Sequence, residues 1–434
     1  MFIIKKTVRK IKGNQFINAS FFSAISSAVK IVTTLIIGKI IALKSGAEGI
    51  AIFGQMLNFV AIIMVLSGGA INEGITKYTS EYRGSRSNDL KPLLSISLQY
   101  ILYSYLLIGI PLIVFSQTIA SIILHRPDYY SVFVLFGFTI VFYGLNNFFL
   151  SIISGHKDFK KFNLINIFNN IFSLLLTSIL IYFFGIYGAL VGVVVNQSVV
   201  FIFTLFFLKN EIWLVKENFV NKFNNEKFKF IFSFAILALL TTAITPLVSI
   251  LIRGMIIQKT SLIDAGYYEF VSRISTTGIM FFAVTVSSYY IPRLSEITNK
   301  SELLNEVKTT YKIIIPVITI ILISIYLSRF IIIKLLATND FLQSECLFSY
   351  QLIGVFFRIL AQITGFVFLA KARIKTVITI EILLNLVYVT LSLVFIQKWG
   401  LLGSVYAFTT YNFIYLITVL LVFCKKFVNT SLME

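Results

Sequence analysis

The stretch GIYGALVGVVVNQSVVFIFTLFF at residues 185–207 decides the fold, because it returns as GLLGSVYAFTTYNFIYLITVLLV at residues 400–422. The two copies lie 215 residues apart, and each opens with G-x-x-G before an apolar run. An apolar run of about 20 residues is long enough to cross a lipid bilayer as a helix. We therefore predict that the chain repeats one membrane-spanning unit.

The same offset of 215 residues holds further upstream in the chain. It pairs Asn170 with Asn385, and near the second span it pairs Glu81 with Glu296. The pattern predicts a parallel duplication without internal gaps.

Apolar residues dominate the whole chain. Of its 434 residues, 58% are hydrophobic and 13% are charged, and the mean hydropathy is +0.91. A soluble core of this length cannot hide so much apolar surface, so we predict a polytopic membrane protein. The windows long and apolar enough to span are 16–43, 50–78, 91–116, 128–155, 160–184, 186–208, 229–257, 265–292, 308–328, 342–370, 374–397 and 400–424.

These windows divide into two copies of six spans. Because six is even, both copies enter the membrane in the same direction and are related by an axis along the membrane normal. The predicted fold class is an all-α integral membrane protein, with twelve transmembrane helices in two pseudosymmetric six-helix lobes around a central cavity. The predicted parts are a cytoplasmic segment 1–15, an N-lobe 16–208, a linker 209–228, a C-lobe 229–424 and a tail 425–434.

The formal net charge of +19 is high enough to suggest a nucleic-acid partner. The cations instead gather in the loops that follow even-numbered spans and at both termini, as the positive-inside rule describes for cytoplasmic segments. We therefore predict cytoplasmic termini and no nucleic acid. The cations of these segments include Lys5, Lys6, Arg9, Lys10, Lys12, Lys77, Arg83, Arg86, Lys91, Lys157, Lys160, Lys161, Lys425 and Lys426.

Two further features repeat or connect the copies. Apolar and charged residues alternate with helical spacing in 209–228, which predicts an amphipathic linker helix on the membrane surface. TIASIILHRPDYY and FIIIKLLATNDFL follow the third and ninth spans and predict matched periplasmic half-helices.

The chain lacks the residue clusters that catalysis or metal binding needs. It has two histidines and two cysteines, Cys346 and Cys424, which lie in or beside separate predicted spans. A disulfide framework, a metal site or an enzymatic reaction is therefore not expected, and no cofactor is predicted.

Three stretches together point to a known family. They are VKIVTTLIIGKIIAL in span one, GGAINEGITKYTSEY at the end of span two, and SSYYIPRLSEITNK at the end of span eight. In order and position they resemble the Wzx-type lipid-linked oligosaccharide flippases, which belong to the multidrug/oligosaccharidyl-lipid/polysaccharide exporter superfamily. The resemblance covers essentially the full chain.

The resemblance implies a function and a location. It implies that an undecaprenyl-pyrophosphate-linked oligosaccharide moves from the cytoplasmic to the periplasmic leaflet of a bacterial inner membrane, by alternating access and with coupling to an ion gradient. It also implies an O-antigen or related polysaccharide as the product. The implied partners are this substrate, membrane lipid, and the polymerase and chain-length regulator of the same pathway, with the protein itself a monomer.

Charged side chains deep inside spans mark candidate substrate contacts, because each costs at least about 2.5–3.5 kcal/mol to insert. Lys30 and Arg358 are central in spans one and ten, and we expect both to face the cavity, where pyrophosphate oxygens would need charge-assisted donors. The alternative for Arg358 is an ion pair with Glu345 or Glu381. For Lys30 it is likewise a buried ion pair.

Three more cations are candidates. Lys39 and Arg253 lie within one residue of equivalent places in the two copies, so they form either a cation gate near the outer leaflet or snorkelling side chains. Arg273 follows Glu269 by four residues, which predicts an intrahelical ion pair that still leaves Arg273 able to reach the cavity.

Polar groups in spans are the remaining candidates. Asn166 and Asn170 share a helical face and either contact sugar hydroxyls or join helices. Glu73 and Glu381 are the candidate coupling carboxylates, although a polar contact between helices explains either one equally well. At the fixed offset the stretch around Glu73 has no counterpart in the second copy.

The cytoplasmic end of span two predicts a gate. We expect Glu81 to pair with Arg293 across the lobe interface when the cytoplasmic entrance closes. The candidate gate residues are Lys77, Glu81, Arg83, Arg293 and Glu296.

Two other functions compete with a flippase. A cation-coupled drug antiporter of the same superfamily would share the architecture. A membrane polymerase or glycosyltransferase of the same pathway would need a sizeable periplasmic loop with clustered acids, histidines or arginines, and the predicted periplasmic loops are only a handful of residues long.

Overall fold

The computed structural model describes residues 2–68, 71–81, 87–209, 211, 213 and 242–428. Over this part of the chain every regular element is helical, which confirms the predicted all-α class. Helices are expected in lipid because they satisfy their backbone hydrogen bonds internally. Seven helical segments here are long and apolar enough to cross a membrane: Phe22–Leu66, Lys91–Val114, Pro127–Gly155, Phe159–Leu208, Lys300–Leu327, Asn339–Ala370 and Ile374–Phe427.

The chain divides into two compact units, each described here by itself. The first is formed by Met1–Lys44 and Met56–Pro246, and the second by Ser45–Gln55 and Leu247–Glu434. The predicted N-lobe of 16–208 contains 45–55 in sequence, yet this piece packs with the second unit. The predicted linker helix lies outside the described residues, apart from 209, 211 and 213.

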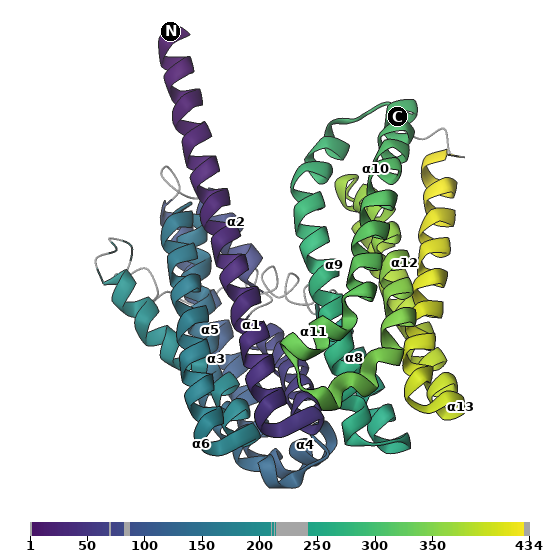
Figure 1. The fold of residues 1–434 in the computed structure, drawn as a ribbon. Helices are drawn as coiled ribbons and strands as arrows, with labels where there is room; N and C mark the ends of the chain where they lie inside the picture. The colour runs from purple at the N-terminus through teal and green to yellow at the C-terminus, as the bar shows by residue number, and fades with distance from the viewer. Residues whose placement is uncertain are drawn as a thin grey trace. The chain divides into compact units, whose positions relative to one another are not determined.

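The first unit is built mainly from α3, α5 and α6, which pack side by side (Figure 1). Its helices, including the first helix that it shares with the second unit, are α1 (Phe2–Leu66), α2 (Asn72–Glu81), α3 (Ser87–Val114), α4 (Ser116–Ile123), the 3-10 turn η2 (Pro127–Tyr129), α5 (Tyr130–Gly155) and α6 (Phe159–Leu208).

In the second unit α12 packs against α9, α10 and α13 (Figure 1). Its helices are α8 (Ile244–Lys259), α9 (Leu262–Glu296), α10 (Lys300–Leu327), α11 (Arg329–Leu336), the 3-10 turn η4 (Asn339–Ser344), α12 (Glu345–Ala370), α13 (Ile374–Phe423) and the short π-helical turn η5 (Cys424–Val428).

The repeated G-x-x-G motif bends a helix of 50 residues in each unit, α6 and α13. Gly185 in α6 has φ 57° and ψ −136°, and Gly400 in α13 has φ 56° and ψ −133°. Only glycine adopts such angles readily. A Cβ added to Gly188 or to its counterpart Gly403 would lie 2.0 Å from a backbone oxygen of the preceding arm, so the second glycine lets the two arms approach closely. The bends confirm the duplication.

The short elements repeat as well. The predicted half-helices are present as α4 and α11, each of eight residues and each followed by a 3-10 turn. The predicted gapless register is wrong for one stretch, because α3 and α10 start at 87 and 300 and end at 114 and 327, an offset of 213. The loops absorb the difference, because loops tolerate insertions best. The connection from α9 to α10 is two residues shorter than that from α2 to α3, and the connection from α11 to α12 is two residues longer than that from α4 to α5.

The predicted continuous span 50–78 is also wrong, because the helix breaks there. The first helix ends at Leu66 and α2 begins at Asn72, whereas α9 runs unbroken to Glu296 in the second copy. Gly68 has φ 128°, a conformation open to glycine, and the offset of 215 places an alanine at the corresponding position of α9. The break lies directly before Glu73, in the stretch that the second copy does not repeat.

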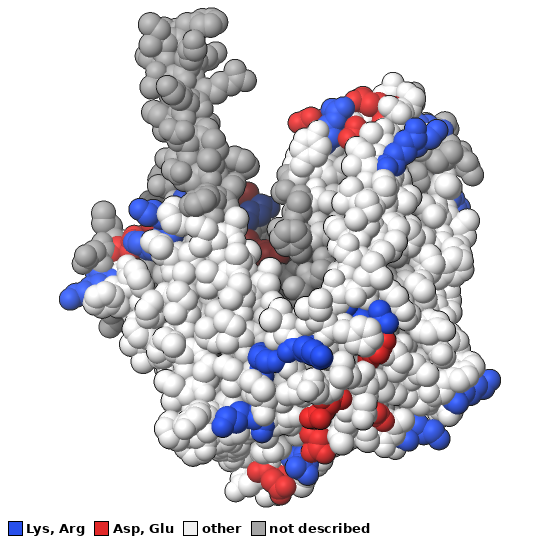
Figure 2. Space-filling view, viewed as in Figure 1, with Lys and Arg blue, Asp and Glu red and all other residues white. Residues whose placement is uncertain are grey.

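The aqueous ends of the helices carry capping residues and charges. Side chains of Asp158, Ser261 and Asn299 accept backbone hydrogen bonds at the starts of α6, α9 and α10. On the face of the second unit drawn in Figure 2, charged side chains gather at the two ends, with an uncharged band between them. This distribution is that of a protein belted by hydrocarbon.

Candidate functional site

The most polar site inside the second unit surrounds Glu381 on α13. Its Oε1 accepts from Arg358 Nη2 at 3.2 Å and from the Tyr415 hydroxyl at 2.7 Å. Asn385 Nδ2 lies 3.3 Å from Oε2. The Arg358 guanidinium also lies 4.1 Å from the centroid of the Tyr415 ring. Of the two carboxylates considered for Arg358, Glu381 is therefore the partner, and Glu345 pairs with Arg329 instead.

Tyrosines continue this network away from Arg358. Arg358 Nη1 donates to the Tyr411 hydroxyl at 3.2 Å, and the Tyr411 ring stacks on Tyr388 with 4.5 Å between centroids. The hydroxyl of Tyr388 lies 3.1 Å from that of Tyr268 on α9. Buried polar groups are costly unless they are hydrogen-bonded, so the chain of partners stabilises these side chains in fixed positions.

A second cluster begins one residue beyond Tyr268, at Glu269. Arg253 on α8 is 1% exposed and its Nη1 pairs with Glu269 Oε2. Its Nε donates to Gln55 Oε1 at 3.0 Å and its Nη2 to the Gly54 oxygen at 3.2 Å. Arg253 thus binds the short piece 45–55 of the first helix to α9 of the second unit.

Arg273 shares the same carboxylate. Its Nη2 donates to Glu269 Oε1 at 3.0 Å, which confirms the predicted intrahelical pair. The guanidinium lies 5.5 Å from the centroid of the Phe53 ring, and its Nη1 is buried without a hydrogen-bond partner among the described residues. Both guanidiniums thus bind Glu269, and one donor atom of Arg273 has no partner among the described residues.

The first unit holds the two predicted lysines. Lys30 has an exposed side chain on α1, and its backbone oxygen accepts from the hydroxyls of Thr33 and Thr34. Lys39 is half-buried on the same helix and does have an interaction partner. No carboxylate pairs with Lys30 within the part of the chain that the structure describes.

The asparagines of the first unit divide into two groups. Asn146, Asn163 and Asn169 join elements by hydrogen bonds, to Thr204, Ser23 and Asn196 respectively. Asn166 and Asn170 are half-buried on α6 and make no side-chain hydrogen bond among the described residues. They lie 215 positions before Glu381 and Asn385, so the first unit carries neutral amides where the second carries its charged network.

The four predicted gate residues that the structure describes pair inside their own unit. Lys77 and Glu81 form an exposed pair at 3.9 Å on α2. Arg293 on α9 lies 2.9 Å from Glu302, 3.7 Å from Glu306 and 4.0 Å from Glu296. Arg83 lies outside the described residues. Glu73 is exposed in the first turn of α2, a place where a carboxylate is favourable to the helix dipole.

Several residues of these networks were not predicted. Nothing in the residue type distinguishes them from other residues of the predicted spans: they are Gln55, Tyr268, Tyr388, Tyr411 and Tyr415. The signal that could have found two of them is the spacing of four between Tyr411 and Tyr415, which puts both on one face of α13 beside Glu381 and Asn385. No group of histidine, cysteine or carboxylate side chains that could hold a metal occurs among the described residues.

Solved structures of membrane transporters have a similar fold. One is the inward-facing form of a multidrug resistance MATE family transporter of the MOP superfamily, 18% identical, covering 93% of this chain and 96% of that one with a TM-score of 0.78. Another is the Lipid II flippase MurJ in an inward closed conformation, 17% identical, covering 94% and 87% with a TM-score of 0.71. The chain therefore has the all-helical, two-lobed fold of the MOP superfamily transporters.

A comparison of the sequence with family models shows the family of this chain. The family model described as Polysaccharide biosynthesis protein matches residues 15–298, and the chain belongs to that family. Full-length relatives are the proteins named Lipid III flippase of Escherichia coli (strain K12) and Shigella flexneri, each 24% identical over 397 residues, 92% of this chain and 95% of theirs.

Proposed function

We propose that this protein is a flippase for oligosaccharides linked to an isoprenoid pyrophosphate, and that it carries them from the cytoplasmic to the periplasmic leaflet of a bacterial inner membrane. The carried oligosaccharides are the repeat units of an O-antigen or a related surface polysaccharide. Both termini are cytoplasmic, and the lobes are 16–208 and 229–424 with alternating access between them.

The observation that carries this proposal is the full-length similarity to two proteins named Lipid III flippase. The likeness to multidrug transporters, at 18% identity, concerns the fold and does not favour drug export. The relatives are named as flippases, which favours transport over a polymerase or a glycosyltransferase.

The charges of the second unit support an anionic substrate. Arg253 and Arg273 share Glu269, and Arg273 Nη1 has no hydrogen-bond partner among the described residues. A guanidinium with a free donor suits a phosphate oxygen better than it suits a cationic drug. Arg358 is bound to Glu381 and contributes less free charge.

The untested roles belong to the same proposal. Lys30 and Lys39 supply cations from the N-lobe, and Asn166 and Asn170 contact sugar hydroxyls. Glu73 is the better coupling carboxylate, because Glu381 is already held by Arg358 and Tyr415. The gate forms when Glu81 and Arg293 leave their present partners and pair with each other, with Lys77, Arg83 and Glu296 beside them.

The test is the loss of this gene in a strain that makes the polymer. The lipid-linked repeat unit is expected to accumulate in the cytoplasmic leaflet, and the wild-type gene is expected to restore export. Accumulation on the periplasmic leaflet would assign the protein to polymerisation instead, and unchanged polymer with altered drug tolerance would assign it to drug export.

A further inference from the structure

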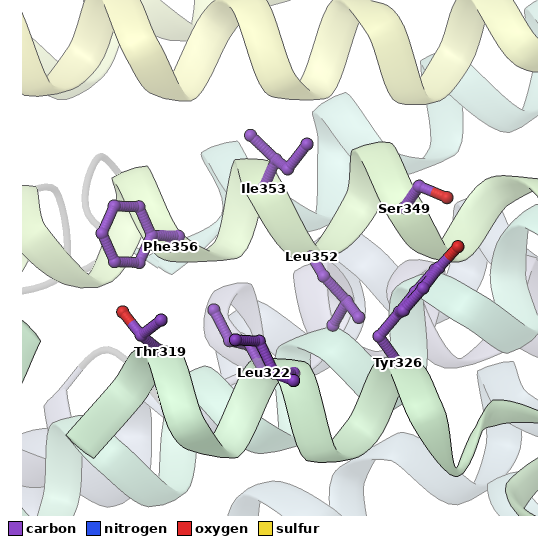
Figure 3. Close-up of a pocket in the computed structure, with 8 residues that line it drawn as sticks. Thr319, Leu322, Tyr326, Ser349, Leu352, Ile353 and Phe356 are labelled. Atoms are coloured by element: carbon purple, nitrogen blue, oxygen red, sulfur yellow. The ribbon is translucent and has the colours of Figure 1, made fainter. Parts of the chain in front are cut away.

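An apolar groove runs between α10 and α12 of the second unit and encloses about 390 Å³ (Figure 3). Cavities of about 300–1,000 Å³ are the usual size for small ligands. The residues that line the α10–α12 groove are Thr319, Leu322, Ile323, Tyr326, Ser349, Leu352, Ile353 and Phe356.

The groove is suited to hydrocarbon. Three hydroxyls are the only polar groups among its lining side chains, and that of Thr319 already donates to the oxygen of Ile315 at 2.7 Å. Ser349 and Tyr326 lie at one end and Phe356 and Thr319 at the other (Figure 3). Seven residues separate Ser349 from Phe356, a rise of about 10 Å along a helix, or about a third of the hydrocarbon core.

The corresponding place in the first unit is closed. The offsets of the two helices place Gly109 of α3 where α10 has Leu322, and Gly137 of α5 where α12 has Leu352. A Cβ added to Gly109 would lie 2.8 Å from the Gly137 oxygen, and one added to Gly137 would lie 2.7 Å from the Gly109 oxygen. Glycines bring α3 and α5 into contact, whereas two leucines line the groove between α10 and α12.

This difference shows that the groove is not a consequence of the fold. Both repeats carry exposed apolar side chains on the third helix, such as Leu107 on α3 and Ile320 on α10, so both meet lipid. General contact with phospholipid chains would need no groove in either copy. A cavity in only one of two duplicated helix pairs indicates a ligand that binds one lobe.

We propose that the α10–α12 groove binds the polyisoprenoid tail of the lipid-linked substrate, an inference that rests on the proposed function. In the proposed topology the Tyr326 end faces the periplasm, so the groove receives the tail in the outer half of the membrane. There Arg329 stacks on Tyr326 at 4.2 Å and is neutralised by Glu345 at 2.7 Å, which leaves the mouth without a free guanidinium to hold the pyrophosphate. The groove therefore holds the tail alone and lets the head group move.

The shape of the lining supports a branched chain. Branched side chains of leucine and isoleucine line the middle of the groove, and aromatic rings stand at both ends. A chain with a methyl branch on every isoprene unit fills such an uneven cavity more completely than a straight acyl chain does. More atoms are then in contact, and the total dispersion attraction is larger.

The test uses the full-length protein in nanodiscs of phosphatidylethanolamine and phosphatidylglycerol. Two photoreactive probes are compared, undecaprenyl phosphate and phosphatidylethanolamine, each with a diazirine in its hydrocarbon part. The undecaprenyl probe is expected to label α10 and α12 at the groove residues, and unlabelled undecaprenyl phosphate is expected to compete. Equal labelling of the groove by the phospholipid probe would overturn the proposal, as would labelling spread evenly over the lipid-facing helices.

Substitutions that fill the groove give a second readout. Ile323→Trp and Ile353→Trp are expected to lower labelling of the groove several-fold and to slow polymer export in the deletion strain. The matched control is Ile321→Trp, because Ile321 is 45% exposed, close to Ile353 at 46%, and lies on the other face of α10. The labelling of the wild-type protein decides the matter even if a tryptophan variant fails to fold.

The two proposals fail separately. Binding of undecaprenyl phosphate requires neither sugar nor transport. If the wild-type gene complements the deletion and both filled variants keep wild-type labelling and export, only the groove assignment is wrong. If the wild-type gene does not restore export, the proposed function is wrong and the tail assignment falls with it.

Discussion

Arg358 and Glu381 show how two charged side chains can be stable inside a membrane-spanning unit. Each charge placed alone in a span is costly, and the pair is stable here because Tyr411, Tyr415 and Asn385 complete its hydrogen bonds. Breaking a buried pair from one side leaves an uncompensated charge, whereas replacing both partners by apolar residues is often neutral.

This asymmetry predicts the outcome of a double-mutant cycle. Arg358→Leu or Glu381→Leu alone is expected to lower the free energy of unfolding by about 1–3 kcal/mol and to reduce membrane abundance, because the pair is half-buried and its remaining charge loses its partner. The double variant is expected to recover most of that loss, as measured by thermal melting of the purified proteins. Equal losses that simply add in the double variant would show that the two side chains do not form a pair.

Lys30 tests the cavity cations of the N-lobe. Because its side chain is exposed and makes no ion pair among the described residues, Lys30→Ala is expected to leave protein abundance unchanged while abolishing polymer export. Lys259→Ala is the control, since Lys259 is also exposed but lies at the end of α8, outside the proposed cavity and gate. Its loss is expected to weaken export only slightly, and full export by Lys30→Ala would exclude a role for this lysine in binding.

At the scale of single residues, the sequence predicted contacts within one helix better than contacts between helices. The pair of Arg273 with Glu269 follows from a spacing of four residues. The partner of Arg358 was narrowed to two carboxylates, and Gln55 was not anticipated at all. Gln55 reaches Arg253 from almost 200 residues away, and no local pattern encodes such a contact.

The matching bends in α6 and α13 are direct structural evidence for the duplication. In α6 and α13 a glycine with positive φ turns the chain, and a second glycine three residues later lets the arms meet. The conformation costs a residue with a Cβ about 1–3 kcal/mol.

Alanine at the bends is therefore expected to destabilise both units alike. Gly185→Ala and Gly400→Ala should each lower the free energy of unfolding by about 1–3 kcal/mol in thermal melting of the purified protein. Gly278→Ala in α9 is the control, because nothing lies within 4 Å of a Cβ built there. A melting temperature for either bend variant that matches this control would contradict the strain assigned to the glycines.

The elements themselves were largely predictable, and their interruptions were not. Apolar runs of membrane length locate the helices, and the repeat locates the bends. The break after Leu66 was missed because the small residues Ser67–Ala70 interrupt the apolar run only briefly, and the turn signal of Gly68-Gly69 was not used. The half-helices TIASIILHRPDYY and FIIIKLLATNDFL already match at an offset of 212, so the sequence showed a local shift. Its extension over the whole of α3 and α10 was missed because the offset of 215 returns on either side.

For the whole molecule, the two native cysteines report the topology. Cys346 begins α12 and Cys424 ends α13, and both are exposed. A membrane-impermeant maleimide added to spheroplasts is expected to label Cys346 and to reach Cys424 only after the membrane is permeabilised. External labelling that persists in Cys346→Ser would place the C-terminus on the periplasmic side and contradict the proposed orientation.

The central claim is that the protein moves a lipid-linked oligosaccharide between leaflets. The most direct measurement reconstitutes the purified protein in liposomes that contain an undecaprenyl-pyrophosphate-linked oligosaccharide with a fluorophore on the sugar, and adds an impermeant quencher outside. We expect the protected inner-leaflet fluorescence to fall with the wild-type protein and to stay high with Arg273→Ala of equal abundance. Protection that remains unchanged with active wild-type protein, under every ion gradient tried, would contradict this claim.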